Sequence, residues 1–212
     1  RVAEGSAVCA ALVDALRKGK RVTVFVEVQA RFDERSNLFW GEALEQAGAE
    51  VRYSYANLKV HCKLCLIERQ ERGRTVRYAY LGTGNFNEST SRIYADMALL
   101  TKRPALTSEV VEVFKHLMDR SKRPALKHLL MAPTTLRDRL EALIDKEIEQ
   151  ALLGNKAAIL LKLNSLEDRA LIRKLHDASN AGVQVHLIIR GICCLVPGVV
   201  GMSANIQAIS IV

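Results

Sequence analysis

The feature that most constrains the fold is an alternation of helix-like and strand-like segments in the first third of the chain. In the helix-like segments apolar residues recur every three or four positions, and the first of them stops at Gly19. The strand-like segments are short β-branched runs, such as R-V-T-V-F-V-E-V at 21–28. The predicted order is helix, strand, helix, strand, over residues 6–19, 21–28, 37–48 and 50–55. This order is typical of an α/β protein whose sheet is covered by helices.

The middle of the chain predicts a hairpin, one more strand and a helix. The run L-K-V-H-C-K-L-C-L-I-E has alternating apolar residues, and a polar turn with Gly73 separates it from R-Y-A-Y-L. A helix follows, with Ser108 as its expected N-cap. The predicted bounds are 58–68 and 76–81 for the paired strands, 70–74 for the turn, 95–101 for the next strand and 108–118 for the helix.

A boundary is predicted near residues 121–133, where Pro124, Pro133 and a basic cluster interrupt any regular period. We therefore expect one complete domain over 1–120, a linker over 121–133, and the start of a second domain over 134–212. The second part again alternates helix and strand, over 134–153, 157–163, 167–181 and 183–190, and ends on the strand-like run I-S-I-V.

A weak internal repeat links the two parts. Residues 12–31 and 171–190 each contain a helix, a glycine and a β-branched strand, and each ends on an arginine, Arg31 or Arg190. Many α/β proteins contain such a pattern, so from this comparison alone a true duplication stays open.

Composition narrows the class of partner. The net charge is +8 and the isoelectric point about 9.4, which favours an anionic partner such as a nucleotide, a polyanion, a nucleic acid or an acidic membrane. Aromatic residues make up only 5%, which argues against a base-stacking surface for single-stranded nucleic acid. No signal peptide is visible, and no apolar run reaches the roughly 18 residues that a membrane span needs.

The five cysteines predict neither a zinc site nor a disulfide framework. Cys62 and Cys65 have a C-x-x-C spacing, but no second Cys or His pair is spaced to complete a zinc site. We expect the cysteines to be small buried apolar residues in a reducing compartment.

His61 and Lys63 are the first candidate site residues. If both lie on one strand, their period-2 spacing places them on the same face. A neutral imidazole can attack phosphorus, and a lysine can stabilise charge on the phosphate oxygens. The loop Gly82-Thr83-Gly84-Asn85 could offer backbone N–H groups and an amide to the same phosphate. The alternatives are a core histidine and an ordinary hairpin end.

Three arginines and one tyrosine are further candidates. Arg1, Arg31 and Arg190 could clamp phosphates, because guanidinium groups match phosphate oxygens; the alternative is a solvated surface arginine. Arg190 ends an apolar strand, so its charge needs a partner. Tyr94 could stack on a base or donate its hydroxyl, and the alternative is a half-buried aromatic residue.

Several longer strings are similar to known families. His61-Cys62-Lys63 followed by Gly82-Thr83-Gly84-Asn85 resembles the H-x-K…G-[ST]-x-N half-motif of the phospholipase D superfamily, although Glu68 stands where that family usually has aspartate. The strings K-V-H-C-K-L, Y-A-Y-L-G-T-G-N-F-N-E-S-T-S-R-I-Y, L-K-L-N-S-L-E-D and I-I-R-G-I-C-C-L-V-P-G-V-V-G-M-S-A-N-I resemble bacterial polyphosphate kinases. The resemblance extends over essentially the whole chain.

The resemblance implies a phospholipase-D-like mixed sheet flanked by helices. It also implies reversible transfer of the ATP γ-phosphate to inorganic polyphosphate through a phosphohistidine, with Mg²⁺ as cofactor. The implied partners are ATP or ADP and polyphosphate, not nucleic acid, in a cytoplasmic homo-oligomer; peripheral association with the inner membrane stays open. The implied site residues are His61 as phosphorylated group with Lys63 beside it, Tyr94, Arg190 and Asn85 at the nucleotide and phosphates, and Arg1 and Arg31 at the magnesium-phosphate site.

Because the chain begins at Arg1 and ends on a strand-like run, we expect it to be an excised catalytic fragment. The resemblance implies a second catalytic histidine beyond Val212, so little activity is expected from residues 1–212 alone. Two other functions stay open. A phospholipase-D-like phosphodiesterase would use the same histidine on a phosphodiester, and a polyanion-binding module would need no catalytic histidine.

Overall fold

The computed structural model describes residues 2–28 and 34–211. The chain divides into two compact units, Arg1–Leu129 and Leu130–Val212. Both are mixed α/β units, in agreement with the α/β class predicted from the sequence. The candidate residues Arg1 and Arg31 lie outside the described residues.

The first unit opens with two helix–strand pairs, as the sequence predicts. Helix α1 (Ala7–Arg17) precedes strand β1 (Thr23–Val26), and helix α2 (Glu34–Gln46) precedes strand β2 (Glu50–Tyr53). The two strands are parallel, with Val24 opposite Val51. Cys9, Leu44 and Ala49 form the buried centre of the small core between the helices and this sheet.

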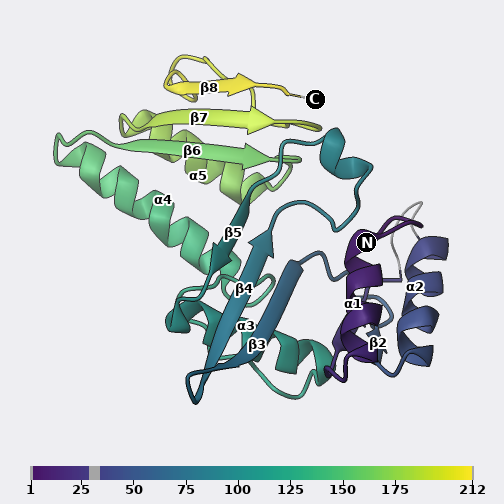
Figure 1. Ribbon diagram of the computed structural model, residues 1–212. Helices are drawn as coiled ribbons and strands as arrows, with labels where there is room; N and C mark the ends of the chain where they lie inside the picture. The colour runs from purple at the N-terminus through teal and green to yellow at the C-terminus, as the bar shows by residue number, and fades with distance from the viewer. Residues whose placement is uncertain (1, 29–33, 212) are drawn as a thin grey trace. The chain divides into compact units, whose positions relative to one another are not determined.

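A separate antiparallel sheet completes the first unit (Figure 1). Strands β3 (Lys63–Glu71), β4 (Arg74–Gly82) and β5 (Ala98–Thr101) follow one another in order, and helix α3 (Pro104–Met118) lies against β3 and β4. Arg72 and Gly73 form the β3–β4 turn, and both have positive φ angles of 50° and 76°. Two positive φ angles give the turn the backbone twist that matches paired strands, and this fixes the hairpin register.

Three local predictions are wrong. The predicted strand 58–68 begins only at Lys63, so His61 precedes the strand instead of lying in it. Ser108 is not an N-cap: α3 already begins at Pro104, and the Ser108 hydroxyl donates to the Pro104 carbonyl within the helix. A proline at the first helical position explains the early start, because its fixed φ suits a helix. The last strand, β8, is Ile206–Ile209, so it overlaps the predicted I-S-I-V run only at Ile209, and Ser210 and Ile211 follow it.

The second unit is a parallel three-stranded sheet with helices on one face. Strands β6 (Ala158–Leu163), β7 (Gln184–Ile189) and β8 lie in that order, and helices α4 (Leu136–Leu152) and α5 (Arg169–Asn180) pack on each other. Burial alternates along β7, where Val185, Leu187 and Ile189 are buried and His186 is exposed. This alternation is expected when only one face of a sheet is covered. The buried face and the two helices form one apolar core.

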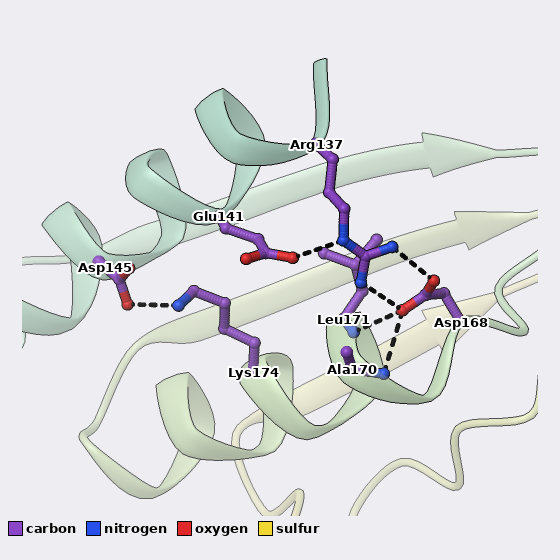
Figure 2. A network of polar contacts seen from close by, with 7 residues as sticks. All are labelled: Arg137, Glu141, Asp145, Asp168, Ala170, Leu171 and Lys174. Carbon is purple, nitrogen blue, oxygen red and sulfur yellow. Dashed lines mark hydrogen bonds and ion pairs between the residues drawn. The ribbon is translucent and has the colours of Figure 1, made fainter. Parts of the chain in front are cut away.

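Charged side chains join α4 to α5 (Figure 2). Asp168 caps α5 by accepting from the backbone N–H groups of Ala170 and Leu171. Its two oxygens also accept from the Arg137 guanidinium at 2.8 and 3.0 Å. These hydrogen bonds from Arg137, with those from the backbone, lower the pKa of Asp168 well below its usual range. Lys174 and Asp145 make a second pair between the same helices, at 2.7 Å.

The helix-to-strand turns of the two units have the same backbone geometry. After α1, Gly19 has a φ of 72° and its N–H donates to Leu16, while the next N–H donates to Ala15. After α5, Gly182 has a φ of 100° and the corresponding bonds run to Ser179 and Ala178. This pair of bonds is the Schellman motif, which needs a left-handed residue and therefore favours glycine. The same pair of bonds also ends α2 at Gly48 and α4 at Gly154, so this turn does not by itself distinguish a repeat.

Candidate functional site

A small cavity in the first unit brings the central candidate residues together. Its volume is about 90 Å³. That is well below the roughly 300 Å³ or more of pockets that enclose a whole small-molecule ligand, so the cavity suits a single small group. Its lining residues come from the end of β1, the start of β3, the loop after β4 and helix α3: Phe25, Glu27, Val60, His61, Cys62, Lys63, Leu64, Asn85, Phe86, Phe114 and Leu117.

His61 and Lys63 are in contact, as the sequence predicts, although they do not share a strand face. The Lys63 ammonium donates to the His61 carbonyl at 2.9 Å and lies 3.0 Å from Nδ1 and 3.1 Å from Nε2 of the ring. A neutral imidazole has one acceptor nitrogen, and the Lys63 ammonium is almost equally far from both ring nitrogens. These distances therefore do not indicate which tautomer of His61 is present. Lys63 is 6% exposed, whereas His61 is exposed. The buried cation is thus held against an accessible imidazole.

The glycine loop after β4 is shaped by its own neighbours. A side chain at position 84 would bring its Cβ against the Asp96 carboxylate, so glycine leaves room for that group. Asp96 also accepts a hydrogen bond from the Thr83 hydroxyl at 3.0 Å. From the sequence, these glycines were predicted to let backbone N–H groups approach a phosphate. The geometry gives Gly84 a structural reason that the sequence could not supply.

Asn85 offers a polar atom toward the cavity. Its side-chain Oδ1 is buried, and none of the described residues hydrogen-bonds to it. An unsatisfied buried polar atom typically costs about 1–3 kcal/mol, so such an atom at a cavity is a candidate ligand contact. The oxygen and nitrogen of an amide are interchangeable by a flip, so Asn85 can present either an acceptor or a donor to a bound group.

Tyr94 follows a short turn whose conformation depends on Asn87, a residue that the sequence analysis did not single out. Asn87 is buried, and its Oδ1 accepts from the N–H groups of Ser89 and Thr90 and from the Ser89 hydroxyl. These bonds cap the 3₁₀ turn Thr90–Arg92, and Tyr94 then donates its N–H to the Thr90 carbonyl. The signal was available, because an asparagine two residues before a serine is typical of such side-chain caps.

Glu27 is a second residue that sequence reasoning missed. It directly follows β1, is 8% exposed, and lines the cavity with His61 and Lys63. Its Oε2 accepts from the backbone N–H of Val60 at 2.5 Å. The available signal was a carboxylate at the end of the apolar run V-T-V-F-V-E, because a charge in a buried strand needs a partner.

Arg190 belongs to the second unit. It follows β7 directly, its side chain is exposed, and its N–H donates to the Leu163 carbonyl at 3.2 Å. The adjacent Gly191 fits tightly, because a Cβ there would lie 2.9 Å from the Asn164 carbonyl oxygen. Arg190 therefore lies at the carboxyl edge of a parallel sheet, the edge at which α/β sheets usually bind ligands.

The prediction for the cysteines is mostly wrong. Cys9 is buried, but Cys62, Cys193 and Cys194 are exposed and Cys65 is intermediate. The prediction relied on the apolar sequence neighbours of the cysteines. Cys62, Cys193 and Cys194 lie in loops, and Cys65 lies on β3, an edge strand of its sheet. Within residues 2–28 and 34–211, no group of three His, Cys, Asp or Glu side chains could hold a metal ion. Among the same residues, no helix has both the length and the apolarity to cross a membrane.

The fold and the site define a mixed α/β chain with a histidine–lysine pair at a small cavity. Two family descriptions match it: "Polyphosphate kinase C-terminal domain 1" over residues 1–123 and "Polyphosphate kinase C-terminal domain 2" over residues 129–212. The chain belongs to the polyphosphate kinase family.

Individual relatives agree with this assignment. The polyphosphate kinase of Vibrio vulnificus strain YJ016 is 49% identical over the whole chain, which covers 30% of that relative. The Escherichia coli K12 polyphosphate kinase is 45% identical, again over the whole chain and over 31% of the relative. The crystal structure of the Porphyromonas gingivalis polyphosphate kinase matches 99% of this chain with a TM-score of 0.83 and 41% identity, and 35% of that protein is covered. The chain thus spans about a third of the length of these relatives.

Proposed function

We propose that this chain carries a phosphoryl-transfer site that moves the γ-phosphate of ATP reversibly to inorganic polyphosphate through His61. The observation that carries the proposal is the exposed imidazole of His61, held within 3.1 Å of a buried ammonium at the mouth of a cavity sized for one small group. Membership of the polyphosphate kinase family supports the choice of substrates.

The proposed reaction has two displacements. In the first, the unprotonated ring nitrogen of His61 forms a bond to the γ-phosphorus, and the bond from phosphorus to the bridging oxygen breaks with its electron pair on ADP. In the second, a terminal oxygen of polyphosphate attacks the phosphorus, and the electron pair of the N–P bond returns to the imidazole. The other ring nitrogen keeps its proton throughout, so no external acid or base is needed to balance either step.

The roles of the other residues follow from charge. Lys63 neutralises negative charge on the transferred phosphoryl oxygens. Asn85 contributes an amide donor in the cavity. By resemblance, Tyr94 and Arg190 contact the nucleotide, and Arg1 and Arg31 contact its phosphates.

Magnesium has no protein site in this proposal. The described residues contain no cluster of metal ligands, and arginines do not bind cations, so the ion implied by the resemblance would arrive on the nucleotide phosphates. No step of the proposed reaction is therefore assigned to it.

The proposal includes the finer architecture. We propose phospholipase-D-like domains over 1–120 and 134–212 joined by a linker over 121–133, and the division of the chain into two compact α/β units near residue 129 supports it. The resemblance adds a cytoplasmic homo-oligomer that acts on ATP or ADP and polyphosphate and not on nucleic acid. Residues 1–212 alone are expected to have little activity, since polyphosphate synthesis by the relatives involves chains about three times as long.

The test uses γ-labelled ATP and a full-length polyphosphate kinase that carries this chain. Acid-labile, base-stable label is expected in the wild type and absent in His61→Ala, because phosphorylated histidine has that stability. His186→Ala, which alters an exposed histidine on β7, is the matched control and should be labelled like the wild type. Label that persists in His61→Ala would assign the nucleophile to another residue.

The two alternatives give different results. A phosphodiesterase would hydrolyse a generic phosphodiester at a rate that ATP does not change. A polyanion-binding module would bind polyphosphate equally with or without His61, with an affinity that falls steeply as salt increases.

A further inference from the structure

We infer that Glu27 is a positioning residue for His61: its buried carboxylate fixes the backbone that presents the imidazole and offsets the charge of Lys63. The inference rests on the proposed function, because it assigns Glu27 a role only if His61 is the nucleophile. It starts from the place of Glu27, a carboxylate that is 8% exposed, at the end of β1 and in the lining of the His61 cavity.

The first argument is the lack of regular structure around His61. Residues 54–62, between β2 and β3, belong to no helix or strand, so no sheet ladder sets their backbone. The Val60 N–H, one residue before His61, donates to Oε2 of Glu27 at 2.5 Å. A hydrogen bond to a charged acceptor is among the stronger ones in proteins. This bond therefore ties the segment that presents His61 to β1.

The second argument is that Glu27 is itself held in place. Its carbonyl accepts from Nδ2 of Asn37 at 2.8 Å, and Oδ1 of Asn37 accepts from the Val2 N–H at 3.0 Å. The next residue, Val28, donates its N–H to the Ser54 hydroxyl at 3.0 Å. Asn37 is 2% exposed and lies on α2. Functional groups keep their geometry when packed, hydrogen-bonded neighbours support them, and Glu27 has that support.

The third argument is charge. Glu27 and Lys63 line the same cavity, and both are more than nine-tenths buried. A buried ammonium without a nearby carboxylate is costly and tends to turn toward water or lose its proton. The carboxylate of Glu27 therefore helps to hold the Lys63 side chain in the cavity and in contact with the imidazole, which is the arrangement that the proposed transfer uses.

The experiment compares Glu27→Gln and Glu27→Ala with the wild type in a full-length polyphosphate kinase that carries this chain. Glutamine keeps an acceptor for the Val60 N–H but removes the charge, whereas alanine removes both. Glu45→Gln, on an exposed position of α2, is the matched control. The rate of His61 labelling at saturating γ-labelled ATP, the ATP concentration for half-maximal rate and the fraction of folded protein are measured for each variant.

The expected labelling rate per folded molecule falls about tenfold in Glu27→Gln and about 10²-fold in Glu27→Ala, since small misplacements of a reacting group cost rates of this order. The ATP concentration for half-maximal rate should stay within about twofold, because Glu27 acts on the nucleophile and not on nucleotide binding. Glu45→Gln should match the wild type.

Two results would overturn the inference. One is labelling of both Glu27 variants at the wild-type rate per folded molecule, which would leave Glu27 a structural role only. The other is a change confined to the ATP concentration for half-maximal rate, which would place Glu27 in nucleotide binding. In both cases the proposed function stands if His61→Ala stays unlabelled. An unlabelled wild type would instead contradict the proposed function, and the inference with it.

Discussion

The two units of this chain bury different kinds of residues. Among the described residues, the buried polar side chains of the second unit are Ser179 and Ser203. Its buried apolar ones are Ile144, Ala157, Ile159, Leu166, Ile172, Leu175, Ala178, Val183, Val185, Leu187, Ile189, Leu195 and Ile206. The first unit is longer, yet its buried apolar residues are Cys9, Leu44, Ala49, Ala79, Val110 and Val113, and its buried polar ones are Ser6, Glu27, Asn37, Lys63, Asn87, Thr107 and Glu109. The second unit is therefore stabilised mainly by an apolar core, and the first by directed polar contacts as well.

This difference between the two units correlates with the location of the candidate site in the first unit. Apolar packing is non-directional and tolerates small shifts, whereas a buried polar group must meet its partner at a defined distance. In the first unit, Glu27 and Lys63 are buried in the lining of the His61 cavity, Asn37 is buried and donates to the Glu27 carbonyl, and Asn87 sets the turn before Tyr94. If the proposed site is correct, the first unit holds its charged groups in place with buried polar contacts, where the second unit has apolar packing.

The largest effect is expected in the apolar core of the second unit. Leu187 on β7 is 1% exposed, and Leu187→Ala should lower the free energy of unfolding of that unit by about 2–5 kcal/mol, because it removes buried surface and leaves a cavity. Urea denaturation followed by circular dichroism measures the change.

The matched control is Leu160→Ala on the neighbouring strand β6. Leu160 is 71% exposed on the uncovered face of the same sheet, so its loss should change the free energy of unfolding by less than about 0.5 kcal/mol. Equal effects at the two positions would contradict the one-sided core.

A buried carboxylate in the first unit should have the next largest effect. Glu109 on α3 accepts from the backbone N–H groups of Lys127, His128 and Leu129. Glu109→Gln replaces one carboxylate oxygen by an amide that cannot accept, so we expect a loss of about 1–3 kcal/mol in urea denaturation. Glu112→Gln, one turn further along the exposed side of α3, should be nearly neutral, because its ion pair with Lys115 is solvated.

Glu109 should also make the stability of the first unit depend on pH. Burial acts to raise the pKa of Glu109, but the three backbone N–H groups outweigh it and lower the pKa below the ordinary value of 4.5. The stabilisation is therefore complete above pH 4.5 and is lost as the pH falls through the lower pKa of the folded protein. Thermal unfolding between pH 3 and 6 should show this loss in the wild type, and a parallel loss in Glu109→Gln would contradict it.

A smaller effect on stability is expected from two serines, one at a helix N-terminus and one inside a helix. Ser6 caps α1 by accepting from the Cys9 N–H, and Ser6→Ala should cost about 1 kcal/mol in the free energy of unfolding. Ser108, which the sequence suggested as a cap, lies inside α3, so Ser108→Ala should be neutral or slightly stabilising, since alanine has the higher helix propensity. The opposite order in thermal denaturation would restore Ser108 as the cap.

The smallest effect is expected for the exposed ion pair of the second unit. Arg137 binds Asp168 and also Glu141, at 2.9 Å, on the solvent side of α4 and α5 (Figure 2). Arg137→Ala should lower the melting temperature less than Leu187→Ala, Glu109→Gln or Ser6→Ala, and the difference from the wild type should shrink in high salt, because exposed pairs are screened. A salt-independent loss would show that the contribution is packing by the arginine side chain.

The sequence by itself determined the order of helices and strands and the α/β class. These follow from local chemistry: periodic apolar residues and glycine at left-handed helix ends. It also selected His61 and Lys63 as neighbours, but through a shared strand face that the structure does not have, because β3 begins at Lys63. The same local reasoning misplaced the start of β3, the cap of α3 and the burial of Cys62, because sequence neighbours do not reveal which face a partner covers.

Only the tertiary structure decided how the site is held. Glu27 and Val60 are 33 residues apart, and Glu109 and Leu129 are 20 apart. No local pattern predicts that such pairs meet, since a hydrogen bond between distant segments depends on the packing of the elements that carry them. Residues of a reactive type could thus be found in the sequence, whereas the buried groups that orient them became visible only in the fold.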